Sequence, residues 1–338
     1  MTELTLFTEE VRTFINENLT PELKKAGELS AGVYADQPVA LEWHKILNTK
    51  GWAVPTWPVA WGGTDWSPTQ HAIFSRELTL SMAPPISPNS TRMVGPVLIE
   101  FGTDEQKSCY LPRIRSGDDW WAQGYSEPGA GSDLASLTCA AVRDGDHYVI
   151  NGSKIWTTHA QWSNKIFCLV RTDTSGKPQQ GITFLLFDLD LNGIQVKPLI
   201  SISGDHEFNQ VFFDAVRVPV TALLGVENQG WTVAKYLLQH ERGGKSATAL
   251  QVRFEHLKTF LSNTDNMRSA LANDPTYRNE LALLGIGIDT FSSLESRVFS
   301  AVASGKPVGT ISSALKIRRA ELKQQLTQSV MTAVNYYG

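Results

Sequence analysis

The chain has 338 residues, of which 42% are hydrophobic and 19% charged, and its formal net charge is −4 at pH 7. This composition is typical of a folded globular protein with room for two or three hydrophobic cores, and it excludes a largely disordered chain. The small negative charge gives no attraction to nucleic acid or to an anionic membrane. The sequence contains no uninterrupted run of about 18 apolar residues, the length that a membrane-spanning helix needs. We therefore expect no nucleic-acid partner and no membrane span.

The cysteines exclude two further classes of protein. Cys109, Cys139 and Cys168 are too far apart for a zinc motif, and their odd number argues against a complete disulfide framework. The N-terminus is acidic and lacks the basic start and long apolar run of a signal peptide. The sequence thus predicts no metal site and a reducing, cytoplasmic location.

Helical signals run through the first part of the chain, residues 1–118. Thr8 is a candidate cap for an amphipathic helix, and Gly51 would end a second helix. Ser67 and Pro68 have the order of a helix cap followed by proline in the first turn. This part is predicted to be all helical, with further helices at residues 39–49, 67–81, 94–101 and 104–114.

The pattern changes in residues 119–228, where short apolar runs with strand-like alternation are separated by Gly, Asp, Asn and Pro. Such runs predict a central antiparallel β-sandwich or barrel. Asn151-Gly152 is a strong hairpin signal, so we expect two strands within residues 144–158 to be joined there. Helical periodicity returns in residues 229–338, which predicts a C-terminal helical bundle with long helices at 231–249, 274–303 and 312–336.

A glycine-rich segment, GYSEPGAGSDLAS at residues 124–136, is too rich in small residues for a core strand. Gly129 and Gly131, between Ser126 and Ser132, allow the backbone to bend tightly and to present bare N–H groups to a ligand such as a phosphate. The alternative is a surface β-meander with glycine turns.

Glu241 is the candidate catalytic residue. It follows two leucines at helical spacings of three and four, so the pattern places it on the apolar stripe of its helix. Desolvation there would raise the pKa of its carboxyl group and make it a better base near neutral pH. The alternative is a structural ion pair with Arg242. Gly243-Gly244 would cost about 1 kcal/mol each in a helix interior, which indicates that a bulky group needs room beside this turn.

Taken together, these runs resemble the acyl-CoA dehydrogenase family over essentially the whole chain and in the same order. GYSEPGAGSDLAS resembles the first flavin signature of the family, and NGSKIWTTHA resembles its Asn-Gly-x-Lys-x-Trp segment. GWAVPTWPVAWGG, FGTDEQKSCYLPRIRSGD, FFDAVRVP, GVENQGW and Glu241-Arg242 occur where the family has comparable runs. The resemblance implies an α+β multidomain fold with an N-terminal helical domain (1–118), a central β-domain (119–228) and a C-terminal helical bundle (229–338).

The resemblance also implies an activity in lipid metabolism. It is the FAD-dependent α,β-dehydrogenation of an acyl-CoA thioester to the 2-enoyl-CoA. In that reaction Glu241 would remove the α-proton, flavin N5 would take the β-hydride, and electrons would pass to an electron-transfer flavoprotein.

Site residues follow from the same resemblance. Gln123, Tyr125 and Ser126 match family positions that contact the flavin ring, and Gly131 and Ser132 match positions near its pyrophosphate. Trp156 matches a tryptophan that packs against the ring, and Thr158 matches a threonine that hydrogen-bonds near N5. Arg242 matches a position near the ligand and the base, and Ser132 also lies near the CoA portion, so these two residues are predicted to bind the substrate. The predicted cofactor residues are Gln123, Tyr125, Ser126, Gly131, Ser132, Trp156 and Thr158.

Two runs of the family have no counterpart in the sequence. The sequence ends at NYYG, where relatives continue through another helix and a flavin-binding loop, and the family's Arg-x-x-Phe-Gly segment is absent. Either the sequence is truncated, or part of the pocket comes from elsewhere, such as another subunit; the expected assembly is a homo- or hetero-oligomer. A flavin oxidase or monooxygenase on the same fold, and a non-catalytic subunit of a heteromeric dehydrogenase, stay open as alternatives. The sequence does not identify the acyl group.

Overall fold

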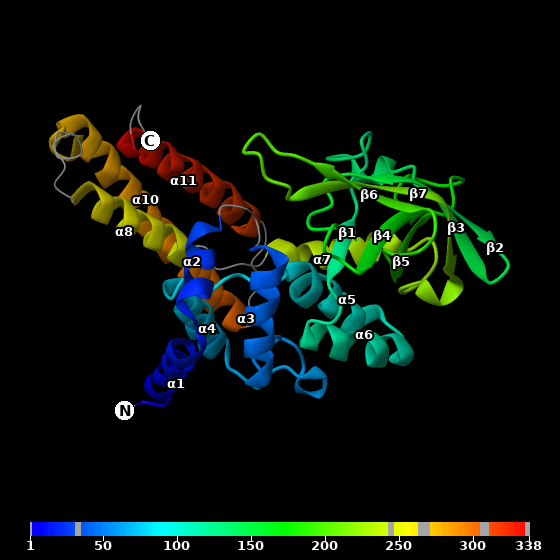
Figure 1. Cartoon of the computed structure of the whole chain (residues 1–338), viewed down its shortest axis with the longest axis horizontal. Helices are drawn as coiled ribbons and strands as arrows, with labels where there is room; N and C mark the ends of the chain where they lie inside the picture. Colours follow the sequence, from blue (N-terminus) through cyan, green and yellow to red (C-terminus); the bar gives the residue numbers. More distant parts are fainter. Residues whose placement is uncertain (1, 31–34, 243–246, 263–270, 305–310, 335–338) are drawn as a thin grey trace. The chain divides into compact units, whose positions relative to one another are not determined.

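The structure is a computed structural model that describes residues 2–30, 35–242, 247–262, 271–304 and 311–334, without the side chains of residues 241, 242, 302, 303 and 312 (Figure 1). The chain forms two compact units. The first comprises Met1–Glu17, Trp66–Ala83 and Arg242–Gly338, and the second comprises Asn18–Asp65 and Pro84–Glu241.

The first unit is helical. Its C-terminal helices α8, α10 and α11 lie side by side around an apolar core that includes Leu257, Phe291 and Leu322. The helices of this unit are α1 (Glu3–Asn18), α4 (Pro68–Leu80), α8 (Ala247–Ser262), α10 (Pro275–Ala303) and α11 (Ile311–Val334). Of the predicted helix at residues 231–249, the structure describes α7 (Gly230–Arg242) and the start of α8 at Ala247, and the residues between them lie outside the described part.

Local capping signals were correct in one helix and wrong in another. Ser67 caps α4, since its Oγ accepts a hydrogen bond from the Gln70 backbone N–H at 3.3 Å, and the Gln70 side chain accepts from the Ser67 N–H in return. Thr8 does not cap α1, which begins five residues earlier. The helix starts earlier because buried Phe7 extends the apolar stripe toward the N-terminus. The Thr8 hydroxyl therefore lies inside the helix, where it donates to the Leu4 carbonyl at 2.7 Å.

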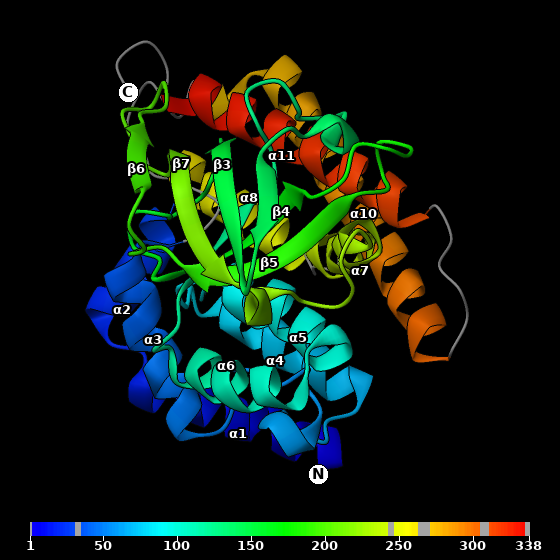
Figure 2. The ribbon, with the colours of Figure 1, turned by 90° about the vertical axis from the view of Figure 1, so that its right-hand side faces the viewer.

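The second unit combines helices with the β-sheet (Figure 2). Its helices are α2 (Pro21–Leu29), α3 (Gln37–Thr49), α5 (Gly95–Phe101), α6 (Asp104–Ser116) and α7 (Gly230–Arg242). Its strands are β1 (Trp121–Gly124), β2 (Ala140–Asp144), β3 (His147–Lys154), β4 (Lys165–Arg171), β5 (Ile182–Asp188), β6 (Ile194–Leu199) and β7 (Phe208–Pro219).

Within the described residues, the strands form one curled sheet in the order β1-β4-β2-β3-β7-β6, and β5 pairs with β4. Most pairs are antiparallel, as predicted, but β4 runs parallel to β1 and meets β2 in parallel at one residue pair. The long excursion through β2 and β3 between β1 and β4 allows that parallel pairing. Helical segments flanking a central β-domain are thus confirmed.

The hairpin predicted at Asn151-Gly152 is wrong. Both residues lie inside β3, and the chain turns instead between Asp144 and His147, where Gly145 has φ +61°. Gly152 marks a bulge against β7, and a Cβ there would lie 2.8 Å from the Cys139 Cα. The glycine therefore permits close strand packing, a requirement that shares its sequence signal with a turn.

Two apolar cores cover opposite faces of β4. Phe167 and Leu169 belong to a core that also contains Tyr125 and residues of α5 and α7, whereas Ile166 and Cys168 belong to a core enclosed by the sheet. Because β4 is buried on both faces, its sequence is a continuous apolar run with no polar alternation. The end of β1 and the helix that bears Glu241 consequently share one core.

Candidate functional site

The predicted cofactor residues fall in two segments of the second unit. The turn segment, residues 123–132, begins in β1 and continues through the glycine-rich turn. The strand-end segment, residues 154–159, begins with the last residue of β3. Their spatial relation decides whether the two sequence motifs form one site.

The backbone joins these segments directly. The Ile155 N–H donates to the Ser126 carbonyl at 2.9 Å, and Lys154 Nζ donates to the Tyr125 carbonyl at 3.2 Å. Buried Tyr125 also packs its ring against Phe167, with the centroids 6.0 Å apart. Residues about thirty positions apart in sequence are therefore adjacent.

The turn segment closes on itself and leaves Gly129 and Gly131 open. Glu127 and Ala130 exchange two backbone hydrogen bonds, at 2.9 and 3.0 Å. Gly131 and Ser132 follow as exposed residues, and a Cβ built on Gly131 would have no neighbour within 4 Å. An open, exposed backbone of this kind suits a bulky anionic group such as a pyrophosphate. Gln123, at the other end of the segment, is half-buried in β1.

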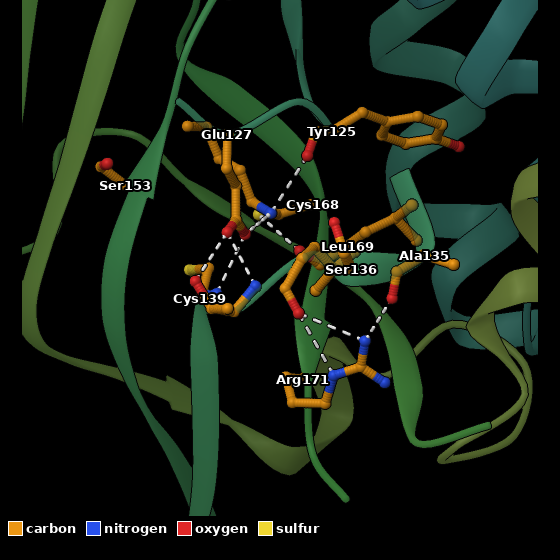
Figure 3. Close-up of polar contacts among 12 residues, drawn as sticks. Tyr125, Glu127, Ala135, Ser136, Cys139, Ser153, Cys168, Leu169 and Arg171 are labelled. Carbon is orange, nitrogen blue, oxygen red and sulfur yellow. Dashed lines mark hydrogen bonds and ion pairs between the residues drawn. The ribbon is translucent and has the colours of Figure 1, made fainter. Parts of the chain in front are cut away.

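The Glu127 carboxylate is the hydrogen-bonding centre of the turn segment (Figure 3). Its Oε1 accepts from Lys154 Nζ at 2.7 Å and from the Cys139 N–H at 2.9 Å. Its Oε2 accepts from the N–H and the hydroxyl of Thr138, at 2.7 and 3.0 Å. Burial alone would raise the pKa of Glu127, but the Lys154 charge and these hydrogen bonds outweigh burial and lower it.

The strand-end segment has a strained backbone. Trp156 has φ +59°, a left-handed conformation that costs a non-glycine residue about 1–2 kcal/mol. Its indole is 60% exposed and meets Phe208 edge to face, with the centroids 6.0 Å apart. Thr158, two residues later, is half-buried. Strain that presents a flat aromatic ring to solvent is characteristic of ligand sites.

Asn209 on β7 holds this strained segment. Asn209 and Thr157 exchange backbone hydrogen bonds at 2.9 and 3.1 Å, and Asn209 Nδ2 donates to the Thr157 carbonyl at 3.1 Å. The Asn209 side chain is fully buried, and its Oδ1 lies 2.8 Å from His206 Nε2. These bonds fix the backbone directly after Trp156, and the Ile155 N–H bond to the Ser126 carbonyl fixes it directly before.

Arg171 secures the chain that follows the turn segment (Figure 3). Its guanidinium donates to the carbonyls of Ala135 and Leu137, with the shortest bond at 2.6 Å, and also to those of Pro178 and Gln180. Burial lowers the pKa of Arg171, although nearby carboxylates oppose that shift. The Arg171 side chain thereby ties residues 135–137 to the loop before β5.

Glu241 and Arg242 are the last residues of α7, and their side chains lie outside the described residues. The preceding turns of the helix bury Val233, Ala234 and Leu237 in the core that contains Tyr125. Near the helix end, Arg92 Nη2 donates to the His240 carbonyl at 3.5 Å. The helix thus shares an apolar core with Tyr125, and the roles of Glu241 and Arg242 stay predictions.

Sequence reasoning assigned no role to Glu127, Lys154 or Asn209. The signal for Lys154 was available, because it shares a face of β3 with buried Tyr148 and Ile150. A lysine on the buried face of a strand requires a buried partner. Asn209 had no such signal, since its role depends on the pairing of β7 with the strand-end segment.

The described residues contain neither a cluster of metal-ligating side chains nor a helix suited to a membrane span. No group of three or more His, Cys, Asp and Glu side chains in that part of the chain could hold a metal ion. None of the helices it contains is both long and apolar enough to cross a membrane. All three cysteines are free, with Cys139 and Cys168 buried.

Comparison with protein families covers nearly the whole chain. The model of the acyl-CoA dehydrogenase N-terminal domain matches residues 1–118. The models of the middle and C-terminal domains of the same enzymes match residues 122–216 and 228–338.

Individual relatives agree with the family match. Acyl-CoA dehydrogenase IpdE1 of Mycobacterium tuberculosis is 36% identical over 302 residues, which cover 87% of this chain and 76% of the relative. The solved structure named Tcur3481-Tcur3483 steroid ACAD superposes with a TM-score of 0.85 at 31% identity, covering 98% of this chain and 85% of its own. The ChsE4-ChsE5 complex from Mycobacterium tuberculosis has a TM-score of 0.82 at 30% identity, with 99% and 86% covered.

Proposed function

The chain belongs to the acyl-CoA dehydrogenase family of flavoprotein oxidoreductases acting on acyl-CoA, and we propose that it converts an acyl-CoA thioester to the 2-enoyl-CoA with FAD as cofactor. The observation that carries the proposal is the hydrogen bond from the Ile155 N–H to the Ser126 carbonyl, at 2.9 Å. It joins the two segments that resemble the flavin-binding runs of the family.

The residues present suit FAD. The exposed Trp156 indole offers a flat surface to an aromatic ring system, and the open turn at Gly131 and Ser132 offers N–H groups to phosphate. We propose that Gln123, Tyr125, Ser126 and Thr158 contribute to the ring end of the same site, and that Ser132 and Arg242 also contact the substrate. Bound FAD supplies the acceptor for the β-hydride, a capacity that no side chain has.

The protein residues then have three tasks. Glu241 takes the α-proton of the thioester in the proposed reaction, at the end of a helix anchored in the same core as Tyr125. Hydrogen-bond donors must stabilise the carbonyl oxygen as charge develops on it. The apolar surroundings must exclude water, so that the donors act in a medium of low polarity.

Ring-bearing acyl groups are the proposed substrate class. A structural relative at 31% identity is named a steroid ACAD, and its TM-score is 0.85. Gly243-Gly244 follow Glu241-Arg242 in the sequence and lie outside the described residues; their lack of side chains is consistent with a bulky acyl group.

The proposed assembly is an oligomer, homomeric or with a related second chain, that passes electrons to an electron-transfer flavoprotein. The relative described as a ChsE4-ChsE5 complex supports a heteromeric arrangement. We keep the domain boundaries at residues 118/119 and 228/229 as part of this proposal, together with a cytoplasmic location, which suits three free cysteines.

Anaerobic titration of the purified full chain tests the function. We expect a yellow protein whose visible flavin absorbance bleaches on adding a ring-bearing acyl-CoA, and bleaches more slowly with a short straight-chain acyl-CoA. The reduced protein should be reoxidised faster by electron-transfer flavoprotein than by oxygen. Fast reoxidation by oxygen would indicate an oxidase instead. A protein that recruits no FAD, alone or with its partner chain, would overturn the proposal.

A further inference from the structure

The Glu127–Lys154 ion pair is almost completely shielded from water. Lys154 is 0% exposed and Glu127 is 6% exposed, and Lys154 Nζ lies 2.7 Å from Glu127 Oε1. Moving both charges out of water costs several kcal/mol per ion, and an apolar pair of similar volume often stabilises a fold equally well or better. Fold stability alone is therefore a weak reason for the pair.

The hydrogen bonds of the pair show what it fixes. Lys154 reaches back to the Tyr125 carbonyl at 3.2 Å, while Glu127 binds the backbone N–H groups of Thr138 and Cys139. Three stretches of chain meet at these two side chains. They are the turn segment, the two residues directly before β2 and the end of β3.

The positions on either side of the pair are the proposed flavin contacts. Ser126 lies between Tyr125 and Glu127, and its carbonyl accepts from the Ile155 N–H. Trp156 lies two residues after Lys154, in a left-handed conformation held on its other side by Asn209. A shift in the pair would therefore displace one residue of each segment relative to the other.

We infer that Glu127 and Lys154 are positioning residues for the cofactor: their ion pair sets the spacing between Ser126 and Trp156 and holds the turn segment in its binding conformation. This inference rests on the proposed function and assigns the pair no contact with substrate. It separates two roles within one motif, since the serine contacts the ligand and the adjacent glutamate orients the serine.

Glu127→Gln in the full chain is the most direct test. The glutamine keeps the size of the side chain but has a single acceptor oxygen, so its amide group would face either Thr138 N–H or Cys139 N–H. We expect faster hydrogen exchange at the amides of Thr138 and Cys139 in the flavin-free chain. We also expect about tenfold weaker binding of FAD to the same protein.

Glu77→Gln is the matched control. Glu77 is 5% exposed and binds Arg12 through two hydrogen bonds, at 2.8 and 3.2 Å, within the first unit. Its loss should lower thermal stability while leaving FAD affinity and the exchange of Thr138 and Cys139 unchanged. Equal loss of FAD affinity in both variants would overturn the inference, because the loss of any buried, ion-paired carboxylate would then have the same effect.

Thr138→Val keeps the test decisive if Glu127→Gln does not fold. Thr138 is exposed, and the change removes only its hydroxyl bond to Glu127 Oε2, at 3.0 Å. We expect FAD binding to weaken about two- to threefold. If FAD affinity and hydrogen exchange at the amides of Thr138 and Cys139 were both unchanged, the positioning role of Glu127 would be overturned. If the unmodified chain binds no FAD, the proposed function fails, and the exchange measurement alone still decides whether Glu127 holds the turn.

Discussion

The Glu127–Lys154 pair and the core of the bundle of α8, α10 and α11 are both buried, but they are built from different interactions. Around Glu127, a buried carboxylate, a buried ammonium group and two backbone N–H groups form one polar centre. In the bundle, the core consists of apolar side chains such as Leu257, Phe291 and Leu322. The described ion pairs of the bundle, Lys258–Glu255 and Arg318–Glu321, lie on its surface.

This difference has a physical consequence. Apolar packing has no directional requirement, so a bundle of this kind tolerates substitutions that conserve volume. A buried polar centre requires each partner at a fixed distance, because an unpaired buried charge is very unfavourable. The region that must hold a ligand in one geometry is therefore the region built from directional interactions, and the following variants test that contrast.

Lys154→Met has the largest expected effect. It leaves the Glu127 carboxylate buried without its cation, which should reduce the free energy of unfolding by about 4 kcal/mol and weaken FAD binding. Urea denaturation and FAD titration measure the two effects. The double variant Glu127→Leu/Lys154→Met should recover much of the stability but not the FAD affinity. If the double variant bound FAD normally, the pair would have no positioning role.

Phe291→Ala should lower stability without affecting the cofactor. Phe291 is 2% exposed in the core of the first unit, and truncation of a buried aromatic ring costs about 3 kcal/mol. FAD affinity, measured by fluorescence quenching, should stay within about twofold of the unmodified value. A loss of FAD affinity as large as that of Lys154→Met would contradict the distinction between the turn around Glu127 and the helical bundle.

The strand-end segment should be sensitive to acid through His159. Burial lowers the pKa of His159 to about 4, a shift that Asp36 opposes and His206 reinforces. Between the unfolded pKa of about 6.5 and the folded value, the unfolded chain binds more protons, so stability falls as pH falls. We expect the His159 contribution to unfolding free energy to fall by about 2 kcal/mol from pH 7 to pH 5.

Denaturation of His159→Gln at the same two pH values provides the comparison. This variant has no imidazole to protonate, so it should lose less stability than the unmodified chain over that range. Identical pH dependence in the two proteins would show that His159 does not titrate as described.

Trp156→Gly has the smallest expected effect on stability. Glycine removes the strain of φ +59°, which offsets the lost contact with Phe208, so unfolding free energy should change by less than about 1 kcal/mol. FAD affinity should nevertheless fall about tenfold, whereas Trp156→Phe should retain it within about threefold. A Trp156→Gly protein that binds FAD normally would show that the exposed indole is not part of the site.

The sequence predicted the structure correctly where a local residue pattern is compatible with only one structure. The Ser67 cap depends only on neighbouring residues, and strands β3 to β7 were visible as short apolar runs. Gly152 was misleading because glycine is favoured both in tight turns and at close strand contacts. Only the position of Cys139, directly before β2, distinguishes the two cases here.

Candidate site residues were found in the sequence through family resemblance, and the residues that orient them were not. Trp156 belongs to a recognisable run, but its left-handed backbone and its restraint by Asn209 arise from the contact with β7. Glu127 and Lys154 both stand inside quoted motifs, yet their pairing depends on the fold. Interactions between distant segments have no local sequence pattern.

Glu241→Gln tests the central claim most directly. Full-length protein carrying FAD is mixed anaerobically with the acyl-CoA that bleaches the unmodified enzyme fastest, and the visible flavin absorbance is followed. We predict that the variant keeps its flavin while its bleaching rate falls at least about 100-fold, because the α-proton has lost its acceptor. Bleaching at the unmodified rate would contradict the assignment of Glu241 as the base of an acyl-CoA dehydrogenase.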